Sequence, residues 1–355
     1  MQSRTDDLRI DQIRPLIPPA IVMEEIPATA EQMDRIAKAR EAAGRIIAGK
    51  DDRLLVVVGP CSVHDPEAGL AYARRLKVVS DELVDDLHVV MRTYFEKPRT
   101  TVGWKGLIND PNLDGSFAIN QGLRVARTYL RDVVDLGMPT GTEFLDPISP
   151  QFVADLVAWG AIGARTTESQ VHRELASGLS MPIGFKNGTD GSIQIALDAV
   201  SSASHPHHFL SVTKQGLAAI VSTSGNDQCH VILRGGKTGP NFDAASVNAT
   251  LEQLKNAGIE RGVMVDCSHA NSQKNHENQV KVSSVLADQI AGGNRGLMGV
   301  MIESFLEPGR QDARPGQKLV FGQSITDACI GFEQTVPTLR NLASAVRARR
   351  QHTHK

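Results

Sequence analysis

Short apolar runs rich in β-branched residues alternate with longer amphipathic segments from Leu54 onward. Parallel strands buried on both faces form such continuous runs, and the amphipathic segments between them indicate helices that pack on the sheet. Eight runs predict the strands Leu54–Val58, His88–Thr93, Met138–Phe144, Ala161–Arg165, Pro182–Lys186, His230–Arg234, Val263–Cys267 and Leu297–Ile302. Eight parallel strands with intervening helices are typical of an α/β protein with a (β/α)8 TIM barrel, and a doubly wound sheet is the alternative fold.

Three further segments complete the predicted organisation. Residues 1–50 combine a proline-rich opening with a helical pattern over Ala30–Ile47, and we expect an N-terminal extension used for oligomerisation or regulation. Residues 51–355 form the barrel, into which the alternating segments Phe209–Val212 and Leu217–Val221 insert a β-hairpin near 205–222. The spacing of apolar residues over Thr326–Arg349 predicts a C-terminal helix.

Composition and charge exclude several classes of protein. The chain has 355 residues, 41% hydrophobic and 22% charged, which suits a soluble globular protein. Lys and Arg number 38 against 40 Asp and Glu, so the net charge of −2 provides no overall field for nucleic acid or an anionic membrane. We find neither a signal peptide nor an apolar run long enough to cross a membrane, and four scattered cysteines do not form a disulfide scaffold. We therefore expect a cytoplasmic protein with reduced thiols.

The residues that close the predicted strands, or follow them closely, carry a pattern of positive charge. In a TIM barrel the active site lies at the carboxyl ends of the strands, so these residues should meet at one mouth. Six of them are cations: Arg92, Lys97, Arg99, Arg165, Lys186 and Arg234. Such a cluster would repel itself unless carboxylates or an anionic ligand neutralised it. The pattern predicts a small, multiply charged substrate whose phosphate and carboxylate groups bind to arginine and lysine.

A second group of residues at the same predicted mouth has the chemistry of a metal site. Cys61, His269, Glu303 and Asp327 lie at strand ends or just beyond them. One thiolate, one imidazole and two carboxylates suit Mn²⁺, Fe²⁺, Co²⁺ or Zn²⁺ and leave room for a substrate oxygen. Taken singly, each residue also fits an ordinary role as a buried thiol, a loop hydrogen-bonding group or an ion-pair partner. Their combination predicts a divalent metal site.

Several motifs in order make the chain recognisable. They are Gly59-Pro60-Cys61-Ser62, Lys97-Pro98-Arg99-Thr100-Thr101 followed by Gly103-Trp104-Lys105-Gly106, Gly163-Ala164-Arg165-Thr166-Thr167-Glu168-Ser169, Gly184-Phe185-Lys186-Asn187-Gly188 and Leu233-Arg234-Gly235-Gly236. From about Asp6 to about Arg349 the chain closely resembles the type I 3-deoxy-D-arabino-heptulosonate 7-phosphate (DAHP) synthases, and among them most closely the phenylalanine-sensitive members. The resemblance implies a metal-dependent, aldol-type condensation of phosphoenolpyruvate with D-erythrose 4-phosphate and water, the first step of the shikimate pathway. It also implies a homotetramer, a dimer of dimers.

The resemblance assigns roles to individual residues. The implied substrate-binding residues are Arg92, Lys97, Pro98, Arg99, Thr100, Ala164, Arg165, Lys186, Arg234, His269 and Asp327. Of these, Pro98, Arg99 and Thr100 would receive erythrose 4-phosphate. The family's metal ligands fall on Cys61, His269, Glu303 and Asp327. The expected catalytic residues are Lys97, Glu143 and His269, and the sequence leaves open whether Lys97 or a water oriented by Glu143 transfers the proton.

The resemblance further implies feedback inhibition by an aromatic amino acid. The effector pocket would lie between the N-terminal extension and the hairpin, and it corresponds to Asp6, Asp7, Phe144, Gln151, Leu175, Leu179, Ser180, Phe209, Ser211 and Val221. Ser180 and the two aspartates, from this or a neighbouring subunit, would bind the polar end of the effector. Pro147 departs from the phenylalanine-sensitive pattern and is similar to tyrosine-sensitive relatives. Phenylalanine is therefore favoured over tyrosine, with tryptophan third.

Two other functions are alternatives at this point. A 3-deoxy-octulosonate 8-phosphate synthase would share the barrel and phosphoenolpyruvate but use arabinose 5-phosphate, and the motif Lys97-Pro98-Arg99-Thr100 and the long extension argue against it. A non-catalytic regulatory paralogue would have lost catalytic residues, whereas every assigned position is filled here.

Overall fold

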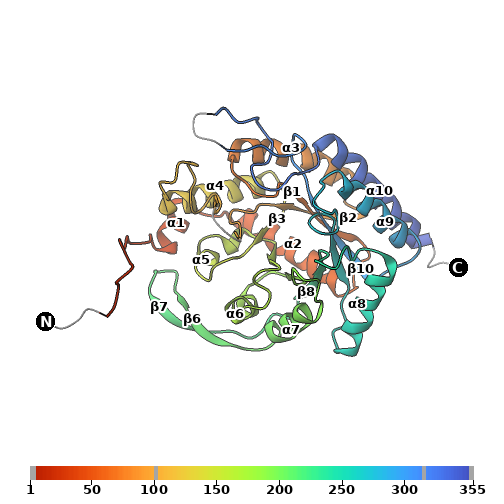
Figure 1. Ribbon diagram of the computed structural model, residues 1–355, viewed down its shortest axis with the longest axis horizontal. Coiled ribbons are helices and arrows are strands. Elements are labelled where there is room, and N and C mark those ends of the chain that lie inside the picture. The colour runs from red at the N-terminus through yellow and green to blue at the C-terminus, as the bar shows by residue number, and fades with distance from the viewer. Residues whose placement is uncertain (1–4, 100–102, 314–316, 352–355) are drawn as a thin grey trace.

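The computed structural model of the chain describes residues 5–99, 103–313 and 317–351. Within these ranges, eight parallel strands close into a barrel in the order β1-β10-β9-β8-β5-β4-β3-β2 (Figure 1). The strands are β1 (Leu54–Gly59), β2 (Leu87–Arg92), β3 (Thr140–Glu143), β4 (Trp159–Ile162), β5 (Ile183–Lys186), β8 (His230–Leu233), β9 (Val263–Asp266) and β10 (Leu297–Glu303). Because β1 pairs with both β2 and β10, the TIM barrel is confirmed and the doubly wound sheet is wrong.

The strand predictions agree with the structure except at some boundaries. The clearest difference is the predicted strand Ala161–Arg165, since β4 begins earlier, at Trp159, and ends at Ile162. Gly163 starts a turn in which its carbonyl accepts the backbone N–H groups of Thr166 and Thr167, so Arg165 lies on a turn beyond the strand. Apolar periodicity extends into this turn, but the backbone hydrogen bonds of the sheet do not.

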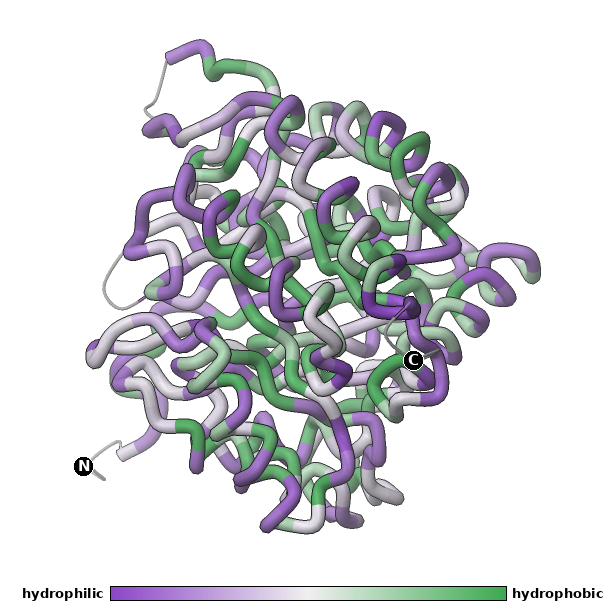
Figure 2. Tube along the Cα trace, turned by 90° about the vertical axis from the view of Figure 1, so that its right-hand side faces the viewer, coloured by the Kyte–Doolittle hydropathy of each residue, from purple (hydrophilic) through white to green (hydrophobic). Residues whose placement is uncertain are grey.

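Helices follow the strands and cover the outer surface of the barrel. They are α3 (Pro66–Glu82), α4 (Ile119–Asp135), α5 (Pro150–Val153) with the 3-10 helix η1 (Ala154–Leu156), α6 (Gln170–Gly178), α7 (Gln194–Ala203), α8 (Ala244–Asn256), α9 (Asn278–Ala291) and α10 (Phe332–Gln351). Figure 2 shows hydrophobic segments concentrated in the interior and hydrophilic ones mostly at the periphery. Asp65 illustrates how the sequence starts a helix: its carboxylate accepts the N–H groups of Glu67 and Ala68. None of the helices in the described ranges is long and apolar enough to span a membrane.

The C-terminal helix begins at Phe332, so the predicted start at Thr326 is wrong. The residues before it pair with the loop that follows β10: Cys329 exchanges backbone hydrogen bonds with Gly309, and the Ile330 N–H donates to the Glu303 carbonyl. These bonds draw the backbone away from a helical path. They also keep Asp327 in a loop at the barrel mouth.

Two helices precede the barrel, α1 (Pro19–Glu25) and α2 (Ala30–Ile47), and α2 has the predicted bounds. Thr29 and Gln32 form a capping box at the start of α2. Ala43, Ile46 and Ile47 of α2 belong to the same buried cluster as barrel side chains such as those of Trp159 and Met298. Because α2 packs on these barrel side chains and precedes the amino-terminal end of β1, it closes that end of the barrel and leaves the carboxyl end for a site. Helix α1 was not predicted, because the prolines in this segment were interpreted as helix breakers. Pro19 instead occupies the first position of the helix, where proline is favourable.

The predicted hairpin insertion is confirmed as β6 (His208–Val212) and β7 (Ala218–Ser222), an antiparallel pair. It lies between α7 and β8 in the chain and curves along the outside of the barrel (Figure 1, green). The backbone N–H of Ala20, in α1, donates to the carbonyl of Lys214 in the hairpin turn at 2.7 Å. The N-terminal segment and the hairpin, the two additions to the barrel, therefore meet.

Candidate active site

A cavity of about 360 Å³ opens at the carboxyl ends of the barrel strands. Its lining includes ten of the residues expected from the sequence: Lys97, Pro98, Arg99, Glu143, Ala164, Arg165, Lys186, Arg234, His269 and Asp327. Thr100 lies outside the described residues. Cys61, Arg92 and Glu303 are buried and are not part of the lining. The strand ends thus form one mouth, in which seven lysine and arginine side chains face two carboxylates, with further charged groups buried near it.

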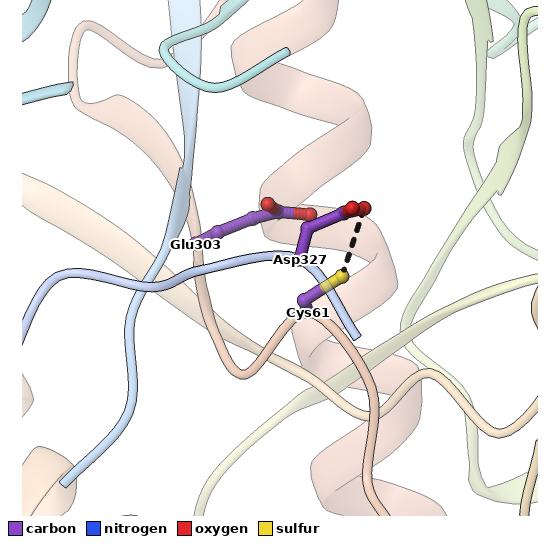
Figure 3. A group of neighbouring side chains, drawn as sticks. All are labelled: Cys61, Glu303 and Asp327. Carbon is purple, nitrogen blue, oxygen red and sulfur yellow. Dashed lines mark hydrogen bonds between the residues drawn. The ribbon is translucent and has the colours of Figure 1, made fainter. Parts of the chain in front are cut away.

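Three of the four predicted metal ligands form a close group near this mouth. The ligand atoms of Cys61, Glu303 and Asp327 lie within 4.8 Å of one another, and the Cys61 thiol donates to Asp327 Oδ2 at 3.4 Å (Figure 3). Burial, together with the negative charge of Glu303, raises the pKa of the Cys61 thiol to about 12. Two carboxylates and a thiol gathered in one place disfavour further negative charge unless a cation binds among them. This donor set fits a divalent metal.

Buried neighbours hold Glu303 in place. The Arg92 guanidinium, 1% exposed, donates from Nη2 to Glu303 Oε1 at 3.3 Å, and Ser268 Oγ donates to Glu303 Oε2 at 2.8 Å. Arg92 also donates to the carbonyls of Pro60 and Cys61, and its guanidinium lies 3.8 Å from the centre of the Tyr94 ring. Arg92, which the resemblance assigned to phosphoenolpyruvate, therefore contacts Glu303 and the backbone beside Cys61 in this structure.

His269, the fourth predicted ligand, lies beside this group. It lines the cavity together with Asp327, and its Nδ1 atom is 2.9 Å from Asp266 Oδ2. Its backbone has a φ of 57°, a left-handed conformation that is uncommon for a residue other than glycine. Burial alone would raise the pKa of Asp327, but its interactions with Lys97 and His269 lower it, which keeps the carboxylate ionised.

Lys97 lies against the same group. Its ammonium donates to Cys61 Sγ at 3.0 Å and to the Cys61 carbonyl at 3.4 Å. Burial opposes its charge, but the neighbouring acidic groups, Cys61 and Glu303 foremost, outweigh burial and raise the pKa of Lys97. Lys97 therefore stays protonated and can donate a hydrogen bond or a proton into the cavity.

Glu143 contributes an acceptor to the lining of the cavity. Its side chain is buried, and Oε1 has no hydrogen-bond partner among the described residues. A Cβ atom at Gly163 would lie 2.2 Å from this oxygen, so any larger residue there would displace the Glu143 carboxylate. A buried carboxylate oxygen without a protein partner can accept a hydrogen bond from water or from a substrate.

Arg165, Lys186 and Arg234 provide the cationic part of the lining. Arg165 is exposed to the cavity, whereas Lys186 is buried and donates to Asp266 Oδ2 at 2.8 Å. Asn187 Oδ1 accepts the backbone N–H of Arg234 at 2.7 Å, and Arg234 Nε is buried without a partner in the described structure. Burial lowers the pKa of Arg234 but leaves the guanidinium charged. Guanidinium donors without protein acceptors fit an anionic ligand.

The structure gives contacts to residues for which the sequence had assigned no role. Asp266 contacts both Lys186 and His269, and these two neighbours hold its pKa well below the usual range although burial alone would raise it. The Gln279 amide accepts the backbone N–H of Glu303 and donates to its carbonyl, at 2.8 and 3.0 Å. Asp266 closes a predicted strand and could have been found that way, whereas Gln279 lies on α9 without any motif. Lys274, His276 and Arg310 also line the cavity, from loops.

A second cavity, of about 640 Å³, lies between α5, α6 and the hairpin. Its lining includes seven of the expected effector-pocket residues, namely Gln151, Leu175, Leu179, Ser180, Phe209, Ser211 and Val221, and also Pro147. Phe144 is instead buried in the core, at 1% exposure. Asp6 and Asp7 are exposed in the N-terminal segment and are not part of this lining within one chain.

Comparison with known proteins agrees with this geometry. The model of the DAHP synthetase I family matches residues 25–340. The chain is 58% identical to the Phe-sensitive phospho-2-dehydro-3-deoxyheptonate aldolase of Escherichia coli K12, covering 99% of this chain and 100% of that protein. It is 57% identical to the tyrosine-inhibited enzyme of Schizosaccharomyces pombe, over 99% and 95% of the two chains. The solved structure of the Francisella tularensis SCHU S4 aldolase superposes with a TM-score of 0.93 at 53% identity, covering 96% of this chain and 99% of that one. The chain therefore belongs to the DAHP synthetase I family.

Proposed function

We propose that the cavity at the barrel mouth is the catalytic centre of this DAHP synthase. The enzyme condenses phosphoenolpyruvate with D-erythrose 4-phosphate and water, and it releases DAHP and phosphate. The observation that carries the proposal is that one cavity of about 360 Å³ combines unpaired guanidinium donors with Asp327, part of a Cys61–Glu303–Asp327 group. The two phosphorylated substrates need guanidinium donors for their phosphate groups. Activation of the aldehyde needs a metal, which the group that includes Asp327 would hold.

Phosphoenolpyruvate binds through Arg165, Lys186 and Arg234 in this proposal. The guanidinium groups receive its phosphate, because each offers a planar fork to two oxygens, and Lys186 adds a point charge. Arg92 contributes from its buried position near Cys61. Erythrose 4-phosphate is held by Pro98 and Arg99, with Thr100 and the backbone at Ala164 completing the set that the family resemblance implies.

Cys61, Glu303, Asp327 and His269 would hold a divalent metal, Mn²⁺, Fe²⁺, Co²⁺ or Zn²⁺, which when bound supplies a Lewis acid for the aldehyde oxygen. Lys97, protonated and 3.0 Å from Cys61 Sγ, is placed to give a proton to the oxygen that becomes a hydroxyl. Glu143, with its unpartnered Oε1, accepts a hydrogen bond from the attacking water.

The reaction forms one C–C bond and replaces the phosphate oxygen on C2 of phosphoenolpyruvate by the oxygen of water. C3 of phosphoenolpyruvate attacks the aldehyde carbon, the new C–C bond forms, and the aldehyde oxygen takes a proton. Water then adds to C2, which has become electron-poor, and the C–O bond to phosphate breaks as C2 becomes a ketone. Of the two protons of the water, one replaces the proton given to the aldehyde oxygen and the other leaves with the phosphate. The cations that held phosphoenolpyruvate remain beside the leaving group, so they stabilise the charge that it carries away.

The second cavity is proposed as the binding site of an aromatic amino acid that inhibits the enzyme. Relatives named Phe-sensitive and tyrosine-inhibited are 58% and 57% identical to this chain. Phe209, Leu175 and Leu179 offer apolar contacts for the ring, and Ser180 offers a polar one. Phenylalanine is favoured, then tyrosine, then tryptophan.

The assembly proposed for the enzyme is a homotetramer, a dimer of dimers, in the cytoplasm. The segment 1–50 serves oligomerisation and regulation, and residues 51–355 form the catalytic barrel. Asp6 and Asp7, exposed in one chain, would reach the effector pocket of a neighbouring subunit. Their exposure and the contact of α1 with the hairpin turn support this arrangement.

The test is substrate-dependent phosphate release by the purified protein with Mn²⁺. We expect inorganic phosphate to appear only when phosphoenolpyruvate and erythrose 4-phosphate are both present, in equal amounts with DAHP. Faster turnover with arabinose 5-phosphate would identify an octulosonate synthase instead. No turnover with either sugar, from protein that binds phosphoenolpyruvate, would favour the regulatory paralogue.

A further inference from the structure

Asp266 connects the two halves of the barrel mouth. It is the last residue of β9 and is fully buried. Its Oδ2 atom accepts the Lys186 ammonium, from β5, at 2.8 Å and lies 2.9 Å from His269 Nδ1. Its Oδ1 atom accepts the backbone N–H of Ser268 at 2.9 Å, which fixes the orientation of the carboxylate. One carboxylate therefore contacts both a cation of the phosphoenolpyruvate side and an imidazole of the metal side.

The loop after β9 is folded to bring His269 to this carboxylate. His269 has a left-handed backbone, and its carbonyl accepts the N–H of Lys274, which is left-handed too, at 2.9 Å. The Asn271 amide donates to the carbonyls of Asp266 and Leu233 and so ties the loop to the ends of β9 and β8. Backbone conformations of this kind persist only where the surroundings impose them, and they cluster at functional sites.

A neutral imidazole carries one N–H proton, and the partner of one nitrogen decides where that proton resides. Nδ1 lies 2.9 Å from the carboxylate oxygen but outside hydrogen-bond geometry, and a proton on Nδ1 removes the repulsion between two facing lone pairs. This tautomer leaves the lone pair of Nε2 available to a metal. We propose that Asp266 is a positioning residue, which sets the tautomer and orientation of His269 for metal binding and uses the Lys186 ammonium as its counter-charge. This inference rests on the proposed function, since it assumes that a metal binds at Cys61, Glu303 and Asp327.

The proposal predicts opposite consequences for the metal and for phosphoenolpyruvate. Replacing the carboxylate by an amide removes the acceptor that selects the tautomer, so Mn²⁺ binding weakens by about 10- to 100-fold, as for other groups that orient metal-ligating histidines. Binding of phosphoenolpyruvate to the metal-free protein is retained or strengthened, because Lys186 keeps its charge and loses a competing anion. General damage to the site would weaken both.

The experiment compares wild type, Asp266→Asn and the matched control Asp86→Asn. Asp86 is also a buried aspartate that holds two cations, Arg347 and Arg350, but it lies just before β2 at the other end of the barrel. Free Mn²⁺ is measured by electron paramagnetic resonance, phosphoenolpyruvate binding to metal-free protein by calorimetry, and the His269 tautomer by ¹⁵N NMR. We expect only Asp266→Asn to lose Mn²⁺ affinity and the Nδ1–H tautomer.

The outcomes separate this inference from the proposed function. Wild-type affinity for Mn²⁺ in Asp266→Asn, or parallel loss of Mn²⁺ and phosphoenolpyruvate binding, overturns the positioning role. An Nε2–H tautomer in the metal-free wild type overturns it without any variant, so poor folding of Asp266→Asn leaves a decisive test. A wild type that binds no divalent metal at all would instead refute the proposed function.

Discussion

The two cavities of this molecule are built from different parts of the fold. The mouth is lined by residues at the ends of strands β3, β5 and β8 and on the loops after β2, β4, β9 and β10, and half of its lining residues are charged. The outer cavity is lined by α5, α6, the hairpin and nearby loops, and no barrel strand contributes to it. The rigid sheet therefore fixes the groups that do chemistry, while outer helices of the barrel and the added hairpin form a separate pocket. Ligands at the two cavities should act independently unless the protein changes conformation.

The largest loss of activity is expected from replacing a metal ligand, because these ligands serve the chemistry at the mouth and take no part in the outer cavity. Cys61→Ala should lower kcat by about 1000-fold or more, since Lewis-acid activation is worth several kcal/mol. The melting temperature should change little, and Cys229→Ala, which alters another buried thiol away from the mouth, should keep full activity. Steady-state kinetics and thermal melting check both variants. Full activity of Cys61→Ala in the presence of a chelator would remove the metal site from the account.

The next effect concerns the anions at the mouth. Arg234→Ala or Arg165→Ala should weaken phosphoenolpyruvate binding by about 1.5–3 kcal/mol, the scale of a charge-assisted hydrogen bond. Arg99→Ala should chiefly raise the KM for erythrose 4-phosphate. The KM values for both substrates, measured on all three variants, test this division. If Arg99→Ala raised only the KM for phosphoenolpyruvate, the assignment of the two substrates to the two ends of the cavity would be wrong.

A change at the outer cavity should leave catalysis intact. Ser180 lines this cavity, so Ser180→Phe fills space that the effector needs. Overpacking of about 1–3 kcal/mol predicts a 5- to 150-fold higher concentration of phenylalanine for half-inhibition, with kcat unchanged. Activity is measured against phenylalanine, tyrosine and tryptophan. Inhibition of the variant at wild-type concentrations, or a wild type insensitive to all three, would contradict an effector site in the outer cavity.

The smallest effect sets the pH range in which the cavities can be compared. His230, at the start of β8, is fully buried, and its Nε2 accepts the Trp159 N–H at 3.3 Å. Burial lowers its pKa to about 4 from 6.5. Between these two pH values the unfolded chain therefore binds a proton at His230, whereas the folded protein does not. Stability should therefore fall by about 1 kcal/mol per pH unit between pH 6.5 and 4. Urea unfolding of wild type and His230→Gln checks this, and an equal slope in both would exclude His230 as the cause.

The sequence predicted which strand ends form the mouth better than it predicted the backbone turns and contacts around them. Buried parallel strands form continuous apolar runs, so their ends, and with them Lys186 and Arg234, could be located without a structure. Hydrophobic spacing cannot show where a backbone finds other partners, and for that reason the C-terminal helix was begun too early, at Thr326. The contact of His269 with Asp266 depends on a left-handed backbone at His269, and no glycine in that loop indicates such a turn in the sequence. The outer cavity was expected only from family resemblance, because its walls come from unrelated elements.

The most direct test of the central claim is metal-dependent turnover at the mouth. DAHP formation from phosphoenolpyruvate and erythrose 4-phosphate is followed in the purified protein before chelation, after removal of metal with EDTA, and after addition of Mn²⁺ to the same sample. The geometry of Cys61, Glu303 and Asp327 predicts loss of turnover with EDTA and its return with Mn²⁺. Turnover that continues at an unchanged rate in metal-free protein would contradict the account.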